Sequence, residues 1–303
     1  MELKQKVQKR TIVSGGCGFI GSHLTDRLIE LGHEVTVIDD LSTGKKENLN
    51  PKVNFLQWDI STMKEDWLGK GSIDYIFHLA ALPSVPFSIE HPTKTHRVNI
   101  NGTYNILKIA KDIGIKKVIF ASSSSVYGDQ ELPYRETAIP HPISPYAFHK
   151  LVGEGYMRLF NEVYGLPTIS LRFFNVYGKR ADPDSEYSLV IAKFLKLKKE
   201  GKPLTIYGNG EQARDFTYVD DVVNACILAM EKPVENEIIN VCNGESVSIN
   251  KLADLIGGEK QYLPERKGDV KNTLGDNKKA RNLLDWKPKI SLEEGLRLME
   301  EQN

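Results

Sequence analysis

Short apolar runs alternate with longer segments of helical periodicity through the first half of the chain. The apolar runs predict strands over Thr11–Ser14, Glu34–Ile38, Val53–Leu56, Asp74–Leu79, Lys117–Ala121 and Thr168–Arg172. Apolar residues recur at helical spacing over Phe19–Leu31, Pro92–Ile113 and Tyr146–Tyr164. Regular alternation of strand and helix is typical of right-handed βαβ units. The pattern therefore predicts an α/β fold with a doubly wound parallel sheet covered by helices on both faces.

The pattern loosens after Phe173, where Gly, Pro, Asp and Tyr become frequent and the apolar runs shorten. A further helix is predicted over Tyr218–Met230, and a strand over Ile238–Val241 that could return to the sheet. We expect a sheet domain over residues 1–172, to which segments near 215–241 return. The remainder, residues 173–303, is expected to form mainly a smaller substrate-binding lobe.

The first predicted strand leads into a glycine-rich turn, Gly15-x-x-Gly18-x-x-Gly21. The glycines permit a tight turn, a close approach of the backbone to a phosphate, and close packing of the following helix on the sheet. Asp39 ends the second strand, near the spacing expected of an acid that binds the adenosine ribose. A carboxylate there repels a 2′-phosphate, and Asp40 strengthens that bias. The sequence thus predicts a Rossmann-type domain that binds NAD in preference to NADP.

Tyr146 and Lys150 lie one helical turn apart, so both side chains share a helix face. The pKa of a free phenol is near ~10, and a neighbouring ammonium together with an oxidised nicotinamide is expected to lower it toward working pH. The phenol is then suited to act as a general base on an alcohol. The strand before this helix ends in four serines, Ser122–Ser125, which supply a hydroxyl to hold that alcohol.

A second copy of the Tyr-x-x-x-Lys pattern occurs at Tyr104 and Lys108. Those residues lie in the middle of a predicted helix that no polar strand end precedes. Tyr146 instead follows Ser144-Pro145 and a polar strand end, which is where the active sites of open α/β sheets lie. We therefore expect Tyr104 and Lys108 to be an incidental surface or interface pair.

The bulk composition excludes several classes of function. The chain has 303 residues and a formal net charge of zero, which disfavours a nucleic-acid partner. The three cysteines are far apart in the sequence and match neither a disulfide framework nor a zinc site, so no metal is expected. The N-terminal segment has no secretory pattern, and no apolar run is long enough to span a bilayer. We expect a cytoplasmic protein with no membrane partner.

These residues resemble the extended short-chain dehydrogenase/reductase superfamily along nearly the whole chain. Within it, the sequence is similar to the nucleotide-sugar 4-epimerases of the UDP-glucose and UDP-N-acetylglucosamine type. The matching segments are Gly15–Gly21, Ile38–Ser42, Asp59-Ile60, His78–Ala81, Asn99, Ser122–Gly128, Tyr146–Lys150 and Arg172–Gly178.

The resemblance implies roles for individual residues of the cofactor and catalytic sites. The implied NAD-binding residues are Gly15, Gly18, Phe19, Ile20, Gly21, Asp39, Asp40, Asp59, Ile60, Leu79, Ala80, Ala81, Asn99, Ser122, Tyr146, Lys150 and Phe173. For Asp59, a plain loop aspartate is an equally good interpretation. The catalytic serine falls on Ser123, and Ser125 falls where a second hydroxyl lines the sugar. By strand alternation, Ser122 and Ser124 would point the other way.

The resemblance also implies a UDP-sugar site built largely from the second half. Asn175 matches an asparagine that contacts pyrophosphate, the segment Leu204–Gly208 matches one that holds uracil, and Arg214 and Arg266 match the two arginines that clamp the diphosphate. The full set of implied substrate residues is Ser84, Ser123, Ser125, Tyr146, Asn175, Leu189, Thr205, Tyr207, Arg214, Arg266, Asp269 and Thr273. A bulky tyrosine at the Thr273 position closes the pocket to N-acetyl groups in the family, so threonine implies room for them.

The resemblance implies inversion of C4 of a UDP-hexose through a transient 4-keto intermediate, with tightly bound NAD. It also implies a homodimer in which helices Pro92–Ile113 and Tyr146–Tyr164 pair with their copies. Related dehydratases and decarboxylases carry an acid beside the catalytic serine, whereas this chain has Ser124 and Ser125 there. The alternatives are a uronate 4-epimerase, a 4-reductase or a synthase on the same scaffold, and a regulator that binds NAD without chemistry.

Overall fold

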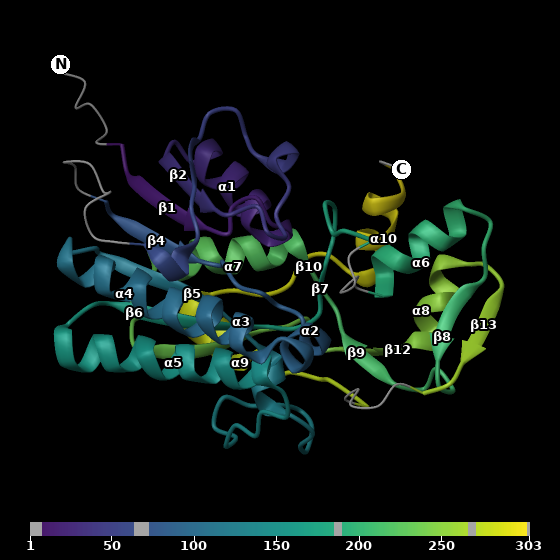
Figure 1. The fold of residues 1–303 in the computed structure, drawn as a ribbon. Helices are drawn as coiled ribbons and strands as arrows, with labels where there is room; N and C mark the ends of the chain where they lie inside the picture. The colour runs from purple at the N-terminus through teal and green to yellow at the C-terminus, as the bar shows by residue number, and fades with distance from the viewer. Residues whose placement is uncertain (1–7, 64–72, 185–189, 266–270, 302–303) are drawn as a thin grey trace.

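The computed structural model describes residues 8–63, 73–184, 190–265 and 271–301 (Figure 1). Its centre is a seven-stranded sheet in which every neighbouring pair is parallel. The strand order is β11 (Glu237–Val241), β6 (Thr168–Phe173), β5 (Lys117–Ser123), β4 (Tyr75–His78), β1 (Arg10–Ser14), β2 (Glu34–Asp39) and β3 (Asn54–Gln57). The predicted doubly wound Rossmann-type sheet is therefore confirmed. The order reverses between β1 and β4, and ligands of such sheets bind at the carboxyl ends of the strands beside that reversal.

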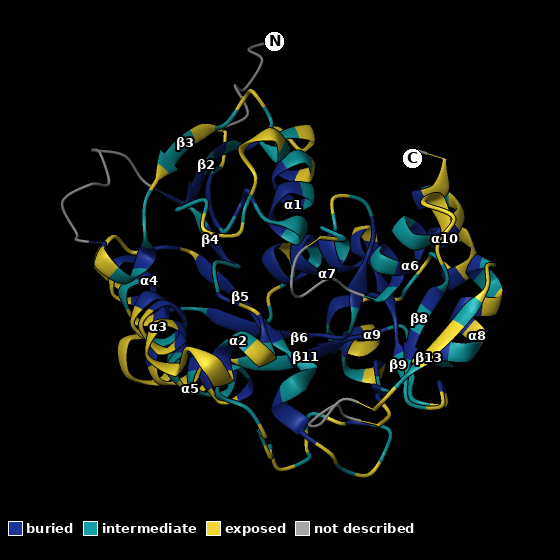
Figure 2. Cartoon of the chain, turned by 45° about the vertical axis from the view of Figure 1, so that its right-hand side comes forward, coloured by how far each residue is buried: buried dark blue, intermediate teal, exposed yellow. Residues whose placement is uncertain are grey.

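Two layers of helices cover the sheet. Helices α1 (Phe19–Glu30) and α7 (Val219–Glu231) lie on one face, and α4 (Gly102–Asp112) and α5 (Pro145–Tyr164) lie on the other (Figure 1). Successive residues of β1 pack into different hydrophobic cores. Val13 belongs to the cluster under α1 and α7, and Ile12 belongs to the cluster under α4 and α5. Each such fully buried side chain stabilises the fold by about 1.5–3 kcal/mol. Figure 2 shows the central strands buried throughout.

The predicted single helix over Pro92–Ile113 is wrong in one respect, because it is interrupted. Helix α3 (Pro92–His96) passes into a π-helical turn over Arg97–Asn101 before α4 begins. The wider turn carries Asn99, whose side-chain amide accepts a hydrogen bond from the Leu82 N–H and donates one to the Leu82 carbonyl, at 2.8 and 3.1 Å. Turns of this kind occur frequently at functional sites, and apolar spacing alone does not reveal them.

The second lobe is built from short strand pairs and helices beside the carboxyl end of the sheet (Figure 1). The pairs are β7 (Val176–Tyr177) with β10 (Thr217–Tyr218), β9 (Ala213–Asp215) with β12 (Ser246–Ser248), and β8 (Leu204–Tyr207) with β13 (Lys260–Leu263). The helices are α6 (Val190–Lys199), α8 (Ile249–Ile256) and α10 (Leu292–Glu300), while α2 (Val85–Glu90) and α9 (Lys278–Leu284) flank the sheet. Across the segments that the structure describes, no helix is both long and apolar enough to cross a membrane.

Candidate functional site

The glycine-rich turn joins β1 to α1 at the reversal of the sheet order. Gly15 has a φ of +77°, and a Cβ there would lie 2.7 Å from the Ala80 nitrogen. A Cβ on Gly21 would lie 2.1 Å from the Gly15 oxygen. Gly18 is the N-cap of α1 and no side chain caps that end, so the first N–H groups of the helix can bind an anion. The turn therefore has the form that a dinucleotide pyrophosphate needs.

Asp39 lies at the end of β2, as predicted, with its carboxylate against the glycine-rich turn. It accepts hydrogen bonds from the Cys17 and Leu41 N–H groups at 3.0 and 2.9 Å. Burial raises the pKa of this carboxyl, while the two backbone bonds lower it. The side chain thus fixes the loop that would receive the adenosine ribose. Asp40 bonds the Ser42 N–H within its own loop, and Asp59 caps a short 3₁₀ turn and pairs with Arg97 at 3.2 Å.

A buried histidine connects the glycine-rich turn to the π-helical turn. His78 Nδ1 lies 2.8 Å from the Ser14 hydroxyl, and Nε2 lies 2.9 Å from the Thr103 hydroxyl. Because Thr103 donates its proton to the Asn99 carbonyl, Nε2 must be the donor to Thr103, so His78 accepts from Ser14. Burial, and to a smaller extent the positive charge of Lys150, lower the pKa of His78 to about 3. The neutral ring therefore holds β1, β4 and α4 together beneath the site.

Tyr146 and Lys150 meet the end of β5, as the sequence predicted. The Lys150 ammonium donates to the Ala121 carbonyl at 2.6 Å and lies 5.9 Å from the centre of the Tyr146 ring. Burial lowers the pKa of Lys150 to about 8, and the charge of Glu154 opposes that shift. The backbone N–H of Tyr146 donates to the Ser88 hydroxyl at 3.1 Å, which fixes the start of α5.

The expected low pKa of the Tyr146 phenol is not a property of the chain by itself. Burial raises the pKa of Tyr146 to about 12, and only a hydrogen bond with Ser123 acts in the other direction. The neighbouring ammonium is visible in the sequence, whereas the loss of hydration around the phenol depends on the fold. In the chain alone the charge of Lys150 does not offset this burial, so the pKa of the phenol falls only if a further cation binds beside it.

The four serines divide between strand and turn. Strand β5 ends at Ser123, and Ser124–Tyr127 form a 3₁₀ turn, so strand alternation separates Ser122 from Ser123 but does not extend to Ser124. The Ser122 hydroxyl donates to Glu154 at 2.5 Å and is buried. Because the hydroxyl is already bonded, Ser122 could contact a cofactor only through its backbone. Ser123 accepts from the Ser125 N–H, and the Ser125 hydroxyl is buried without a hydrogen-bond partner among the described residues.

Two further predicted substrate residues are tied to one another. Asn175 adopts a positive φ of 26°, and its side-chain nitrogen donates to the Asp215 carbonyl and the Thr273 hydroxyl at 2.9 and 3.0 Å. The Thr273 hydroxyl also accepts from the Asp215 N–H, and Thr273 is only 8% exposed. Thr273 is therefore a buried residue that links Asn175 to Asp215 within the lobe. The sequence had instead suggested that it lines an open sugar pocket.

The other predicted residues lie on several elements of the sheet domain and the lobe. The Arg214 guanidinium bonds the Ala213 and Lys271 carbonyls, and the Thr205 hydroxyl on β8 is buried with no partner in the described part of the chain. Ser84 caps α2 by accepting from the Phe87 N–H. Leu79, Ala80 and Ala81 follow β4, Phe173 ends β6, and Tyr207 ends β8. Leu189, Arg266 and Asp269 lie outside the described residues.

Three buried residues that position the site were not singled out from the sequence. Ser88 holds the start of α5, and Glu154 holds Ser122. Asp215 accepts N–H bonds from Asn243, Gly244 and Gly275, so it joins two loops of the lobe. Only Glu154 carried a local signal, because it stands one helical turn beyond Lys150 on the same face.

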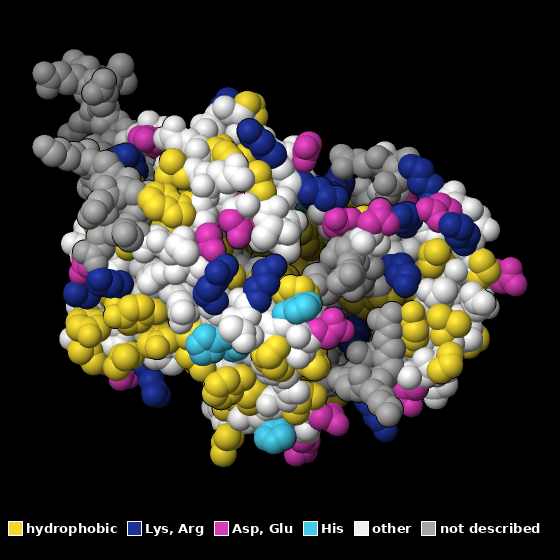
Figure 3. Space-filling model, viewed as in Figure 1, with side chains coloured by type: hydrophobic (Ala, Val, Ile, Leu, Met, Phe, Trp, Pro, Cys, Tyr) yellow, Lys and Arg dark blue, Asp and Glu magenta, His cyan; other side chains and the backbone are white. Residues whose placement is uncertain are grey.

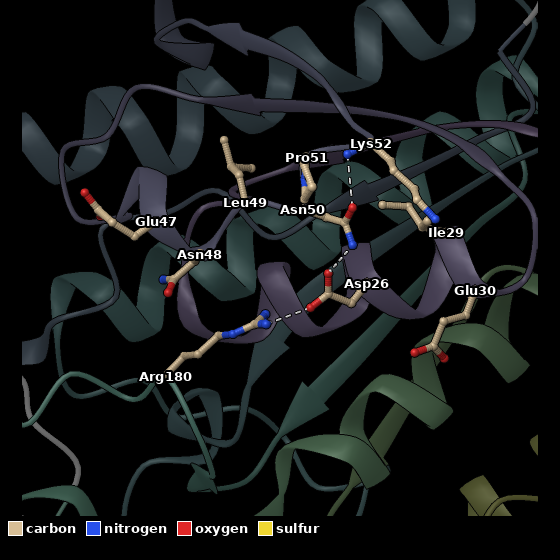
Figure 4. A pocket seen from close by; sticks show the side chains of 10 residues that line it. All are labelled: Asp26, Ile29, Glu30, Glu47, Asn48, Leu49, Asn50, Pro51, Lys52 and Arg180. Atoms are coloured by element: carbon tan, nitrogen blue, oxygen red, sulfur yellow. Dashed lines mark hydrogen bonds and ion pairs between the residues drawn. The ribbon is translucent and has the colours of Figure 1, made fainter. Parts of the chain in front are cut away.

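One cavity lies away from this chemistry. It has a volume of about 650 Å³ and is bordered by α1, the loop after β2 and Arg180 (Figure 4). Arg180 pairs with Asp26 at 2.8 Å there, and Lys45 pairs with Asp182 at 2.9 Å nearby. None of the predicted site residues lines this cavity. These contacts join the lobe to the sheet domain beside the loop that follows Asp39.

The chain matches known proteins along most of its length. The family model described as NAD dependent epimerase/dehydratase family matches residues 11–242. The structure of UDP-glucose 4-epimerase from Thermotoga maritima with UDP-glucose is 43% identical, with a TM-score of 0.93, and the match covers 96% of this chain and 97% of that one. UDP-N-acetylglucosamine 4-epimerase from Methanobrevibacter ruminantium, in complex with UDP-N-acetylmuramic acid, is 41% identical, with a TM-score of 0.92 and 97% of each chain covered.

A third structure was solved with the cofactor. UDP-glucuronic acid 4-epimerase from Bacillus cereus, in complex with UDP-glucuronic acid and NAD, is 34% identical, with a TM-score of 0.89, and the match covers 96% of this chain and 98% of that one. Together these similarities confirm the resemblance inferred from the motifs and the assignment of NAD as cofactor.

We predict that Tyr146 ionises near neutral pH only when NAD⁺ is bound. Because burial raises the pKa of the phenol to about 12, the protonated form is favoured at every lower pH in the chain alone. The measurement is the difference in tyrosinate absorbance between the wild type and Tyr146→Phe. After NAD⁺ is removed, this difference should stay constant between about pH 6 and pH 10. When NAD⁺ is restored, the difference should increase with pH in this range. A tyrosinate signal in the stripped protein at neutral pH would contradict this account.

Proposed function

Because this chain belongs to the NAD-dependent epimerase/dehydratase family, we propose that it inverts C4 of a UDP-hexose. The substrates are UDP-glucose and UDP-galactose, together with their N-acetyl forms, and the reaction passes through a 4-keto sugar. The observation that carries the proposal is the position of Tyr146, Ser123 and Lys150 at the end of β5, beside the glycine-rich turn. The named 4-epimerases of similar structure support the choice of reaction.

The residues present fit NAD. A Cβ at Gly15 or Gly21 would collide with backbone, so this tight turn requires glycine at both positions, and the N-terminus of α1 that follows has no side-chain cap and can take a pyrophosphate. Asp39 offers its carboxylate to ribose hydroxyls and disfavours a 2′-phosphate. When bound, NAD supplies the acceptor and the donor of the C4 hydrogen. Since the reaction has no net oxidation, we propose that the cofactor stays bound through each cycle.

In this proposal Tyr146 takes the proton of the sugar 4-hydroxyl and later returns it. Ser123, which shares a hydrogen bond with the phenol, orients the sugar oxygen. Lys150 contributes the positive charge that favours the phenolate, and the Ala121 carbonyl fixes its ammonium. Inversion requires the 4-keto sugar to present its opposite face, so the sugar must be held more loosely than the nucleotide.

Two buried hydroxyls support a polar ligand in the lobe and at the end of β5. The hydroxyls of Ser125 and Thr205 are buried and lack a partner among the described residues. A buried polar atom without a hydrogen bond costs about 1–3 kcal/mol, and a bound polar group removes that cost. We propose that Ser125 meets the sugar and Thr205 meets the uridine. Arg214 and Arg266 would hold the diphosphate between them.

The alternatives are less well supported. Ser124 and Ser125 stand where an acid would serve a dehydratase or decarboxylase, and Asp39 disfavours the exchangeable NADPH that a reductase needs. A regulator that only binds NAD would have no use for the positioned Tyr146–Ser123–Lys150 group. Uronate 4-epimerases remain the nearest alternative, because one of them is among the similar structures.

We further propose that the protein is a homodimer that pairs α4 and α5 with their copies. One stripe of α5 carries Tyr146, Lys150 and Glu154 toward the sheet, whereas another carries exposed Phe148, Leu159 and Val163, of which Val163 is 60% exposed. Tyr104 on α4 adds to this surface, which Figure 3 shows as hydrophobic side chains gathered over α4 and α5. Exposed apolar patches of this kind mark interfaces.

We also propose that residues 1–172 form the NAD-binding domain, and that residues 173–303 mainly hold the nucleotide sugar. The protein is proposed to act in the cytoplasm. Its three cysteines are buried free thiols, as expected of a chain that folds in a reducing compartment.

The function is tested by the products formed with no cofactor added. The purified protein should interconvert UDP-glucose with UDP-galactose, and the corresponding N-acetyl sugars, as followed by chromatography. Tyr146→Phe should lower kcat by at least about a thousandfold while bound NAD is unchanged, since only the base is removed. Tyr104→Phe, in the second Tyr-x-x-x-Lys pattern, is the matched control and should keep wild-type activity. Near-normal turnover by Tyr146→Phe would exclude the assignment.

The dimer is tested by changing the exposed stripe of α5. The Leu159→Asp/Val163→Asp variant should elute as a monomer in size-exclusion chromatography with light scattering, because charges would face the apolar surface of the partner. Ile139→Asp, at an 85% exposed position in the loop before α5, is the control and should leave the dimer intact. A wild-type monomer, or a variant that stays dimeric, would show that this face is not the interface.

A further inference from the structure

One face of α5 contacts three consecutive residues at the end of β5. Tyr146 shares a hydrogen bond with Ser123, Glu154 accepts one from Ser122 at 2.5 Å, and Lys150 donates one to Ala121 at 2.6 Å. The three helix residues are spaced by one turn each, so they form a single row along the helix. The row fixes both the height and the rotation of α5 against the strand that carries the catalytic serine.

The third residue of this row, Glu154, is part of a buried ion pair. Its carboxylate accepts from Arg172 Nε and Nη2 at 2.8 and 2.7 Å, and both side chains are 2% exposed. Arg172 lies on β6 directly beside Ser122 in the strand register, and its guanidinium stacks on the Tyr127 ring at 4.6 Å. Two charge-assisted bonds of this geometry fix the orientation of the carboxylate.

Lys150 lies one turn before this carboxylate and has few other charges around it. From its own helix, Tyr146, His149 and Glu154 are the nearest titratable groups. From the strands, neutral His78 on β4 lies close to it, and the guanidinium of Arg172 on β6 is bonded to Glu154. The ammonium also rests on the Phe120 ring at 4.9 Å. Glu154 is therefore the anion that offsets the loss of hydration around Lys150.

We propose that Glu154 is a positioning residue for the reaction, one that fixes Ser122 and the adjacent catalytic Ser123 in place and keeps Lys150 charged. This inference rests on the proposed function of the Tyr146–Ser123–Lys150 group. Glu154 touches neither sugar nor cofactor in this role. Arg172 serves to hold the Glu154 carboxylate in the orientation in which it accepts the Ser122 hydrogen bond.

The test compares the pH dependence of kcat in Glu154→Gln and Glu154→Asp. Glutamine keeps the shape and loses the charge, so the alkaline limb of the profile should move down by about one pH unit from its wild-type position near pH 8. At pH 8 the shifted limb lowers kcat of Glu154→Gln by about fivefold relative to the wild type, in addition to any decrease that the variant already shows at low pH. KM should be unchanged. Aspartate keeps the charge, so its limb should stay at the wild-type position even if kcat falls.

The control is Glu162→Gln, which removes an exposed carboxylate from the same helix, where it pairs weakly with Arg158 at 3.9 Å. It should leave the profile unchanged. The proposal is overturned if Glu154→Gln keeps the wild-type limb, or if Glu154→Gln and Glu154→Asp shift it equally, since a purely structural role would affect both alike.

A second variant covers the case in which Glu154→Gln does not fold. Glu154→Gln/Arg172→Met removes both buried charges, a change that folded proteins commonly tolerate. Its alkaline limb should also move down, because the anion beside Lys150 is gone. A limb at the wild-type position in this folded double variant would overturn the proposal.

A readout that needs no turnover separates this inference from the proposed function. The NMR resonance of the Lys150 side chain, assigned with Lys150→Arg, should titrate at lower pH in the NAD-loaded Glu154→Gln or double variant than in the wild type. If the wild type converts no UDP-sugar but this shift occurs, the proposed function fails while the role of Glu154 in holding the charge of Lys150 stands. If the enzyme is active and no shift occurs, the role of Glu154 fails alone.

Discussion

The contact between α5 and the end of β5 is the constraint on which the site depends. A helix can pack on a sheet through apolar side chains at several rotations, but here three polar contacts select one of them. The Lys150–Ala121 bond of 2.6 Å and the Glu154–Ser122 bond of 2.5 Å leave the helix little freedom to slide. Because one of these partners adjoins Ser123, the same contacts that dock the helix also bring the phenol to the serine.

The buried ion pair carries this constraint into the second lobe. Arg172 stacks on Tyr127, the Tyr127 ring stacks on Tyr134 at 4.8 Å, and the Tyr134 N–H donates to the Leu274 carbonyl at 2.8 Å. Leu274 adjoins Thr273, which brackets Asn175 and Asp215. The network that positions α5 therefore also reaches the segment of the lobe around Thr273.

Local patterns were sufficient to predict the sheet and the placement of Tyr146 and Lys150 on one helix face. The apolar runs predicted the strands, the glycine spacing predicted the turn, and the four-residue spacing of Tyr146 and Lys150 predicted a shared face. The short strands of the lobe were missed because runs of two to four residues show no clear periodicity and depend on distant partners. The Asn175–Thr273 bond joins residues 98 positions apart, and the raised pKa of Tyr146 depends on burial, so neither could be read from sequence spacing.

The central claim is that the hydrogen on sugar C4 leaves and returns as a hydride within one closed site. The most direct measurement uses a UDP-hexose substrate deuterated at C4, incubated in ordinary water with the purified wild-type protein and no added cofactor. Mass spectrometry of the C4-inverted product should find the deuterium still on C4. Loss of the label to solvent in the inverted product would show proton exchange instead and would contradict the account.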